Sequence, residues 1–287
     1  QPLEVTETHK TTSQRSPVFD DLTTLHRVAN AGFCFSAKNS LVLAQALYEK
    51  HKALTYPRTD SSHLPEDYLS NVKKAVKLQQ DWKLGVHAKT ALTQKYIQLD
   101  KRIFDNKKIS DHHAIIPTNK LPGNLSEPEL KIYTMITQRF LAVFFPPARY
   151  LNTKRLSVVK QETFLTEGKI QIDPGWKIIY QEHGNQETDK LLTEIPQNAD
   201  VLCKEVAKDR SETKPPQRFN EATLLSAMEN SGKFVEDEEL AEAMKERGLG
   251  TPATRAAIIE KLLKEKYIVR EGKELTPTGK AFELFAL

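Results

Sequence analysis

The stretch TKRLSVVKQETFLTEGKIQIDPGWKIIY, residues 153–180, indicates the fold class of this chain. It is rich in β-branched and aromatic residues, with turn signals at Glu167-Gly168 and at Asp173-Pro174-Gly175, as is typical of strands joined by turns. A further strand is expected over DVLCKEVAK, residues 200–208. We therefore predict an antiparallel sheet within residues 148–215.

The first residues of the chain have the alternation of a single strand that ends at a turn, Ser16-Pro17. Because this strand has no partner nearby in the sequence, we expect it to join the sheet of residues 148–215. Residues 22–147 would then be an insertion between two sheet-forming segments. The predicted fold class is multidomain α+β.

The inserted segment, residues 22–147, has helical periodicity. Apolar residues recur at steps of three and four from Leu41 to Tyr48, which predicts an amphipathic helix with caps at Asn39 and Ser40 that ends near Lys52. A second predicted helix begins at Pro65, and a third runs from Pro128 to Phe144.

The last segment, residues 216–287, predicts three helices followed by a hairpin. Asn220 can cap a helix to about Ser231, DEELAEAMKERG makes a second, and Thr251-Pro252 begins a third that runs to Lys266. YIVREGKELTP then indicates a hairpin that turns at Glu271-Gly272. Helix, helix, helix, hairpin is the order of a winged helix.

Composition bounds the function without deciding it. The chain has 287 residues, 39% of them hydrophobic, and a formal net charge of +4, which permits a polyanionic partner. Cys34 and Cys203 lie far apart without CxxC spacing, which argues against a disulfide framework and a zinc ribbon. No apolar run is long enough for a membrane span and none indicates a signal peptide, so we expect a cytoplasmic protein. The ends, at Gln1 and within TGKAFELFAL, suggest a piece of a longer protein.

LTYPRTDSS, residues 54–62, places a phenol beside a guanidinium. Pro57 favours an extended backbone at Tyr56, so Tyr56 and Arg58 are expected to point to the same side. A guanidinium favours the phenolate and can hold a phosphate, a combination that suggests covalent phosphoryl transfer. The alternative is a turn between helices, with a structural tyrosine and with Asp60 or Ser61 as the next helix cap.

Two other stretches carry candidate site residues. In SDHHAIIPT, residues 110–118, adjacent histidines His112 and His113 should point to opposite sides, and an imidazole can donate to a phosphate. Their spacing is poor for a metal, and the alternative is a packed pair. In GLGTPATRAAII, residues 248–259, a helix N-terminus with Thr254 and Arg255 could bind a phosphate; the alternative is a helix cap alone.

LTYPRTDS, DHHAIIPT, KPPQRF and GLGTPATRAAIIEKLLKEKYI occur in the order and context of the type IA DNA topoisomerases, and the chain resembles their topoisomerase III branch over its whole length. In that family a tyrosine attacks a single-stranded DNA phosphate and forms a 5′-phosphotyrosyl bond, another strand passes through the gap, and the break is religated. The resemblance assigns Tyr56 as nucleophile, Arg58 and His112 to the scissile phosphate, Asp60, Ser61 and His113 to the surrounding site, and Thr254 and Arg255 to the single strand.

The same resemblance implies a domain organisation. Residues 1–21 and 148–215 would form the β arch, domain II; residues 22–147 domain III with the tyrosine; and residues 216–287 part of domain IV, the last two with winged-helix-like cores. A Toprim domain with the Mg²⁺ site would precede Gln1, so this piece by itself is expected to hold no metal and to be inactive in cleavage. The partner implied is single-stranded or underwound DNA, and the family expectation is a monomer; a helicase partner is not identified.

Two rival readings remain open at the level of sequence. In one, the last segment is a winged helix that binds duplex DNA, and Tyr56 is structural. In the other, His112 and His113 serve a phosphohydrolase, which their lack of metal-ligand spacing disfavours. A preference for single strands over duplex would separate the topoisomerase from the winged-helix module.

Overall fold

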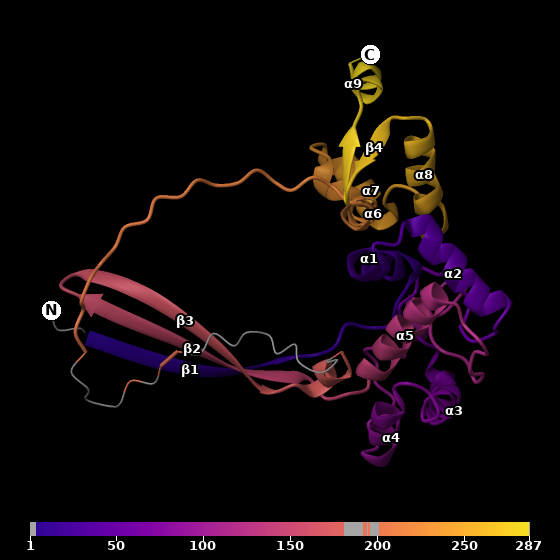
Figure 1. Ribbon diagram of the computed structural model, residues 1–287, viewed down its shortest axis with the longest axis horizontal. Coiled ribbons are helices and arrows are strands. Elements are labelled where there is room, and N and C mark those ends of the chain that lie inside the picture. Colours follow the sequence, from indigo (N-terminus) through magenta and orange to yellow (C-terminus); the bar gives the residue numbers. More distant parts are fainter. Residues whose placement is uncertain (1–3, 181–191, 194, 196–200, 287) are drawn as a thin grey trace. The chain divides into compact units, whose positions relative to one another are not determined.

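The computed structural model describes residues 4–180, 192–193, 195 and 201–286. The chain divides into two compact units (Figure 1). One unit combines Gln1–Ser16 with Ala142–Pro215, and the other combines Pro17–Leu141 with Pro216–Leu287. The C-terminal segment therefore packs with the helical segment, although about 75 residues of sequence separate them (Ala142 to Pro215).

The first unit is built on a three-stranded antiparallel sheet in the order β1-β2-β3. Strand β1 (Glu4–Gln14) pairs with β2 (Ala148–Val159) from Glu4↔Val158 to Gln14↔Ala148. This pairing confirms that the start of the chain joins the later sheet. Strand β3 (Glu162–Asp173) continues into the short 3₁₀ helix η3 (Gly175–Ile179), whose Trp176 indole Nε1 donates to the Gln14 carbonyl at 2.9 Å.

Two details of the predicted sheet are wrong. The turn lies at Lys160, which adopts a left-handed φ of 56°, and not at Glu167-Gly168; Gly168 pairs with Thr153 inside the ladder. Continuous pairing of two long strands outweighs the turn preference of one glycine. In the described residues 201–208 no further strand forms, and only Leu202 makes an isolated bridge. Leu202 and Val206 are exposed there, at 65% and 58%.

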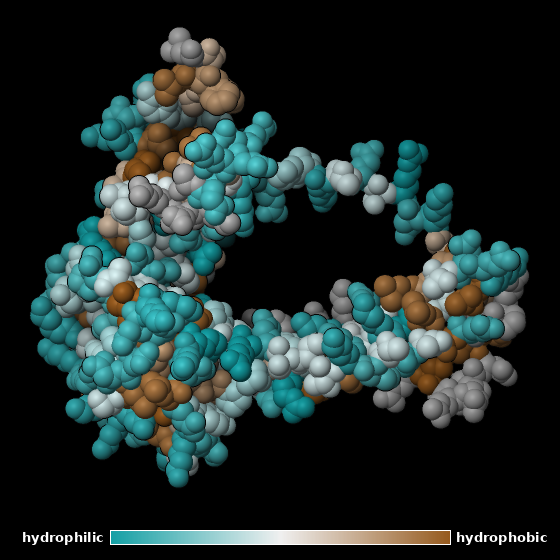
Figure 2. All heavy atoms as spheres, turned by 180° about the vertical axis from the view of Figure 1, so that it is seen from behind, coloured by the Kyte–Doolittle hydropathy of each residue, from teal (hydrophilic) through white to brown (hydrophobic). Residues whose placement is uncertain are grey.

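The described part of this sheet leaves apolar side chains open to solvent, and Figure 2 shows brown surface gathered towards one end of it. Leu156, Phe164, Leu165 and Ile172 are 40% exposed or more. An antiparallel sheet has two faces, and few of the described elements cover them here. Its stability therefore rests on the two long ladders more than on a buried core.

The second unit contains most of the helices, as the periodicity predicts. None of the described helices is long and apolar enough to cross a membrane. The helices are α1 (Leu22–Phe33), α2 (Ala37–Glu49), α3 (Leu69–Gln79), α4 (Gly85–Thr93), α5 (Glu127–Ala142), α6 (Glu221–Glu229), α7 (Glu238–Arg247), α8 (Pro252–Lys264) and α9 (Gly279–Phe285), with the hairpin β4 (Ile268–Glu271) and β5 (Glu274–Pro277).

The observed helix caps differ from the prediction for α2 and agree with it for α6 and α8. Helix α2 is capped by Ser36, whose Oγ accepts from the Asn39 amide at 3.1 Å, so the caps predicted at Asn39 and Ser40 are wrong. Ser40 lies inside the helix, where its hydroxyl contacts the His26 Nδ1 at 2.6 Å. Asn220 and Thr251 begin α6 and α8 as predicted, both with capping boxes.

Apolar clusters among the described residues help to hold the second unit together. The larger packs α1, α2 and α5 through residues that include Leu25, Leu47 and Tyr133. The smaller joins Ala37 of α2 to Leu225, Met228, Ala256 and Ile259 of the C-terminal helices. Burial of each such large side chain contributes about 1.5–3 kcal/mol. The start of α2 is therefore fixed against the C-terminal segment.

Candidate active site

Two extended segments run antiparallel and form the floor of the candidate site. The Thr55 amide donates to the Ile116 carbonyl, the Thr118 amide to the Ala53 carbonyl and the Ala114 amide to the His63 carbonyl, each at 3.0 Å. This pairing brings the LTYPRTDSS and SDHHAIIPT stretches together. Their candidate residues, more than 50 positions apart in sequence, therefore lie at one place.

Tyr56 is half-buried between two other rings. Its ring centroid lies 4.4 Å from the His112 imidazole and 5.4 Å from the Tyr48 ring, which meets it edge-on at 78°. Tyr48 comes from α2, and His112 from the opposite extended segment. Each aromatic contact of this kind contributes about 0.5–1.5 kcal/mol beyond burial, so the phenol is held in one orientation.

Arg58 contacts the same helix as Tyr56. Its Nε and Nη2 donate to the Gln45 Oε1 at 3.4 and 3.2 Å. Gln45 and Tyr48 are three residues apart and share a face of α2. Tyr56 and Arg58 therefore both contact one face of α2, although the backbone bends at Pro57 between them.

The residues after Arg58 fix the backbone of the site. The Thr59 hydroxyl donates to the His112 carbonyl and the buried Ser61 hydroxyl to the Lys108 carbonyl, both at 2.8 Å. The exposed Asp60 carboxylate accepts from the Ser110 hydroxyl at 2.9 Å. Neither Asp60 nor Ser61 caps a helix: the next helical turn, η1 (Glu66–Tyr68), begins after Pro65 without a side-chain cap. The predicted cap at Asp60 or Ser61 is therefore wrong, whereas the segment does lie between α2 and η1, as that alternative also expected.

The two histidines point to different neighbours, as expected for adjacent residues of an extended segment. His112 is exposed and contacts Tyr56, whereas the His113 ring lies 4.8 Å from Tyr68 and its Nδ1 lies 3.0 Å from the Ala114 carbonyl. Burial lowers the pKa of His113, which favours the neutral ring. His113 thus packs behind the site while His112 stands at its surface.

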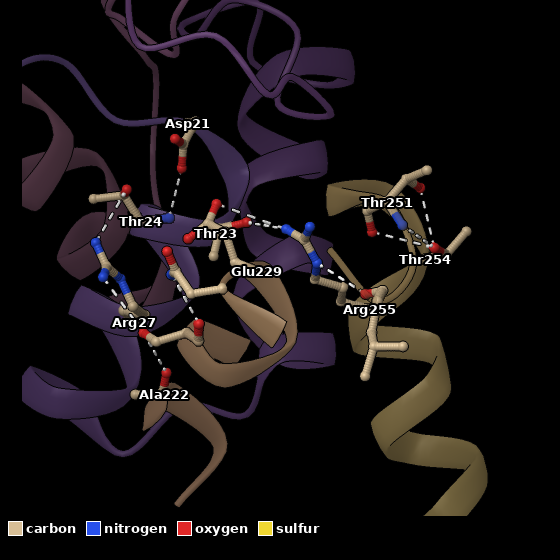
Figure 3. Close-up of polar contacts among 12 residues, drawn as sticks. Asp21, Thr23, Thr24, Arg27, Ala222, Glu229, Thr251, Thr254 and Arg255 are labelled. Carbon is tan, nitrogen blue, oxygen red and sulfur yellow. Dashed lines mark hydrogen bonds and ion pairs between the residues drawn. The ribbon is translucent and has the colours of Figure 1, made fainter. Parts of the chain in front are cut away.

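Thr254 and Arg255 lie apart from these segments in sequence and have different environments (Figure 3). Thr254 is exposed and its Oγ1 accepts from the Thr251 amide at 2.8 Å. Arg255 is only 4% exposed; its Nε donates to the Leu249 carbonyl and its Nη1 to the Thr23 hydroxyl, both at 3.2 Å, and Nη1 lies 3.7 Å from the Glu229 carboxylate. The guanidinium of Arg255 is thus bound within the protein.

The partners of Arg255 connect this loop to the tyrosine segment. Thr23 belongs to the first turn of α1, and the amide of its neighbour Leu22 donates to the Thr59 carbonyl at 3.0 Å. Burial raises the pKa of Glu229 and the nearby Asp21 adds to the rise, while Arg255 and Arg27 oppose it. Two hydrogen bonds of Arg255, the peptide link between Leu22 and Thr23, and the hydrogen bond of the Leu22 amide therefore connect the Leu249 loop to Thr59.

Gln45 and Tyr48 are the site residues that sequence reasoning did not identify. Tyr48 counted there only as part of the apolar face of a helix, and Gln45 is a polar residue with no local motif. Their spacing of three, which places them on one helix face, is the only signal that connects them, and it does not name the segment they contact.

A metal has no obvious place in the described part of the chain. There, no group of three or more His, Cys, Asp or Glu side chains could hold a metal ion. The residues present thus do not fit a metal centre, and no chemical step derived from these residues passes through one.

Comparison with known proteins agrees with these motifs. A DNA topoisomerase family model matches residues 1–287. The chain is 41% identical to DNA topoisomerase 3 of Bacillus licheniformis over 97% of its length and 41% identical to that of Bacillus subtilis over 97%, in each case covering 40% of the relative. It thus spans less than half the length of these relatives.

A solved structure supports the same fold. Full-length topoisomerase I from Thermotoga maritima superposes with a TM-score of 0.63 at 22% identity, over 96% of this chain and 43% of that one. That likeness shows the fold alone, and the sequence matches show the family. The chain belongs to the DNA topoisomerase family, and within it resembles the type IA topoisomerase III proteins.

Proposed function

We propose that this chain carries the nucleophile half of a type IA topoisomerase active site. Tyr56 Oη attacks a backbone phosphorus of single-stranded DNA, a tyrosyl O–P bond forms, and the bond from phosphorus to the 3′-oxygen breaks. The phenol proton leaves to solvent, and the 3′-oxygen gains a proton. The observation that carries the proposal is the position of Tyr56 between His112 and the Arg58 side of α2.

Each neighbour has a role that its chemistry suits. The Arg58 guanidinium can bind two non-bridging oxygens of the phosphate and stabilise the negative charge that grows on the pentacovalent phosphorus. The exposed His112 imidazole can donate to one of the same non-bridging oxygens. Asp60 and Ser61 hold the loop between these groups. Because the tyrosyl ester preserves the energy of the phosphodiester, attack by the 3′-hydroxyl can restore the strand without ATP.

The wider organisation follows the family. We assign residues 1–21 and 148–215 to the β arch, residues 22–147 to the tyrosine domain, and residues 216–287 to a domain that binds the single strand through the exposed Thr254. The Arg255 contact with DNA stays a prediction, and its burial supports a role in holding the Leu249 loop. Mg²⁺ and the remaining catalytic groups would come from the part of the relatives' length that this chain does not span, so the chain alone should not cleave DNA.

The test is covalent trapping, with Mg²⁺, in a protein of the relatives' full length that contains this chain. A 5′-phosphotyrosyl bond leaves the protein on the downstream fragment, so a 3′-labelled oligonucleotide should yield a denaturant-resistant labelled adduct. A 5′-labelled oligonucleotide should instead release a shorter labelled strand. Tyr56→Phe should abolish both products.

Tyr48→Phe is the matched control, because Tyr48 is the tyrosine packed against Tyr56. It should keep the adduct, since only the ring of Tyr48 takes part. An adduct that survives Tyr56→Phe and disappears in Tyr48→Phe would move the nucleophile. An adduct seen with the 5′ label would reverse the polarity and contradict the proposal.

A further inference from the structure

Helix α2 places Gln45 between a carboxylate and the candidate phosphate-binding guanidinium. The Gln45 Nε2 donates to the Glu49 Oε1 at 2.8 Å, one helical turn away. On its other side the Gln45 Oε1 accepts from both Nε and Nη2 of Arg58, at 3.4 and 3.2 Å. Gln45 is half-buried and Glu49 is exposed, so the pair lies at the surface of the helix beside the tyrosine segment.

The chemistry of the two neighbours fixes the orientation of the Gln45 amide. An ionised carboxylate only accepts hydrogen bonds, and a guanidinium only donates them. The amide can satisfy both only with its NH₂ towards Glu49 and its oxygen towards Arg58. Glu49 and Arg58 therefore favour the same orientation of the Gln45 amide, with its oxygen towards the guanidinium.

Gln45 holds Arg58 without neutralising it. Several arginines of this chain are paired with carboxylates, among them Arg155 with Glu7 and Arg270 with Glu221. Within the described residues, Arg58 forms no such ion pair. A guanidinium has five N–H donors, and the contact with Gln45 uses Nε and one Nη2 hydrogen. The remaining donors and the full positive charge stay available for an anion.

We propose that Gln45, oriented by Glu49, is a positioning residue that presents Arg58 to a DNA phosphate as an uncompensated cation. The inference rests on the proposed function, since the phosphate is the one next to Tyr56. A carboxylate in place of the amide would hold Arg58 equally well and cancel its charge. The neutral Gln45 oxygen thus orients the Arg58 guanidinium without compensating its positive charge.

The experiment measures binding of a fluorescent single-stranded oligonucleotide to this chain over a range of salt concentrations. Loss of one phosphate contact lowers the slope of log K against log salt by about 0.7 for a single strand. Arg58→Ala should show this loss. Gln45→Glu should show it too, although Arg58 is still present, and the double variant should lose no more. Gln45→Leu should keep the slope and weaken binding about 2- to 10-fold.

Three further variants serve as controls. Gln94→Glu adds the same charge at an exposed position at the end of α4 and should bind like the unmodified chain. Glu49→Gln keeps an acceptor for the Gln45 NH₂ and should bind normally. Glu49→Ala removes the same charge as Glu49→Gln but also removes the acceptor of the Gln45 NH₂, so Arg58 is held less firmly and binding should weaken, at an exposed position. Thermal unfolding of each variant checks the fold.

The outcomes distinguish a failure of the Gln45 role from a failure of the proposed phosphate contact of Arg58. If Arg58→Ala lowers the slope while Gln45→Glu and Glu49→Ala bind like the unmodified chain, the role of Gln45 is wrong and the phosphate site stands. If Arg58→Ala itself leaves the slope and affinity unchanged, the guanidinium does not bind the strand and both ideas are overturned.

Discussion

At the scale of single residues, His112 and His113 differ in what surrounds them, and this difference predicts different effects of mutation. His112→Ala removes an exposed donor beside Tyr56 and should slow adduct formation in the full-length protein roughly 10- to 100-fold, the cost of a hydrogen bond to a charged group. His113→Ala removes a ring packed on Tyr68 and should instead lower the melting temperature. Single-turnover trapping and thermal unfolding of both variants check this, and equal effects on the rate would contradict it.

His26 and Asp20 give the second unit opposing responses to pH. Burial lowers the pKa of His26 to about 4, so the unfolded chain binds the extra proton between pH 6.5 and 4 and stability falls as pH falls through that window. Burial raises the pKa of Asp20 to about 6, with Arg139 opposing; the folded chain then binds the extra proton between pH 6 and 3.8, and stability rises as pH falls. Each effect reaches roughly 3 kcal/mol.

The two effects nearly cancel in the unmodified chain, so variants are needed to see them. His26→Gln should leave the Asp20 effect alone, and the free energy of unfolding should increase between pH 6 and 4. Asp20→Asn should leave the His26 effect, and the free energy should decrease over the same range. Urea unfolding at several pH values measures both, and parallel curves for the two variants would refute the assignment.

At the scale of elements, the first turn of α2 depends on a carboxylate from α6. Glu221 is 5% exposed; its Oε2 accepts from the Ala37 amide at 2.8 Å and its Oε1 pairs with Arg270 at 2.6 Å. Glu221→Ala should lower the free energy of unfolding by about 1–3 kcal/mol, because a buried helix amide loses its acceptor. Glu260→Ala, which removes only the second partner of Arg270, should cost less than about 1 kcal/mol in the same urea titration.

Elements with local signals could be predicted from the sequence, and those decided by distant contacts could not. Asn220 and Thr251 form capping boxes with residues three positions later, so local sequence determines where α6 and α8 begin. Gly168 looks like a turn residue, but its neighbours pair across the ladder to β2 and keep it in the strand. Leu202 and Val206 have strand propensity and no partner strand in the described residues, and propensity alone does not form a strand.

At the scale of the whole molecule, the proposed function predicts the preferred form of DNA. In competition against a bound fluorescent single strand, unlabelled single strand should displace it at least tenfold better than duplex of the same sequence, because stacking and phosphate contacts need an unpaired strand. The winged-helix alternative predicts the reverse. A duplex preference that survives Arg58→Ala would favour that alternative and make Tyr56 structural.

The candidate site shows what a sequence can and cannot reveal at this scale. Tyr56, Arg58 and His112 could be named in advance because their motifs suit phosphoryl transfer and resemble a known family. Gln45 could not be named in advance, because its role depends on the packing of α2 against the Tyr56–Arg58 segment, which follows α2 in the sequence. The burial of Arg255 could not be predicted from the sequence either, because its partners Thr23 and Glu229 come from other parts of the chain.

The pairing of β1 with β2 also bears on how the protein is made. Gln14 meets Ala148 and Glu4 meets Val158, so β1 leaves the ribosome well over 100 residues before its partner. At roughly 5–20 residues per second, that interval is on the order of ten seconds, ample time for the intervening helices to fold. An orphan strand is prone to wrong pairing during such a wait. The charges of β1, at Glu4, Glu7 and Lys10, give it solubility until the chain that completes its sheet has been synthesised.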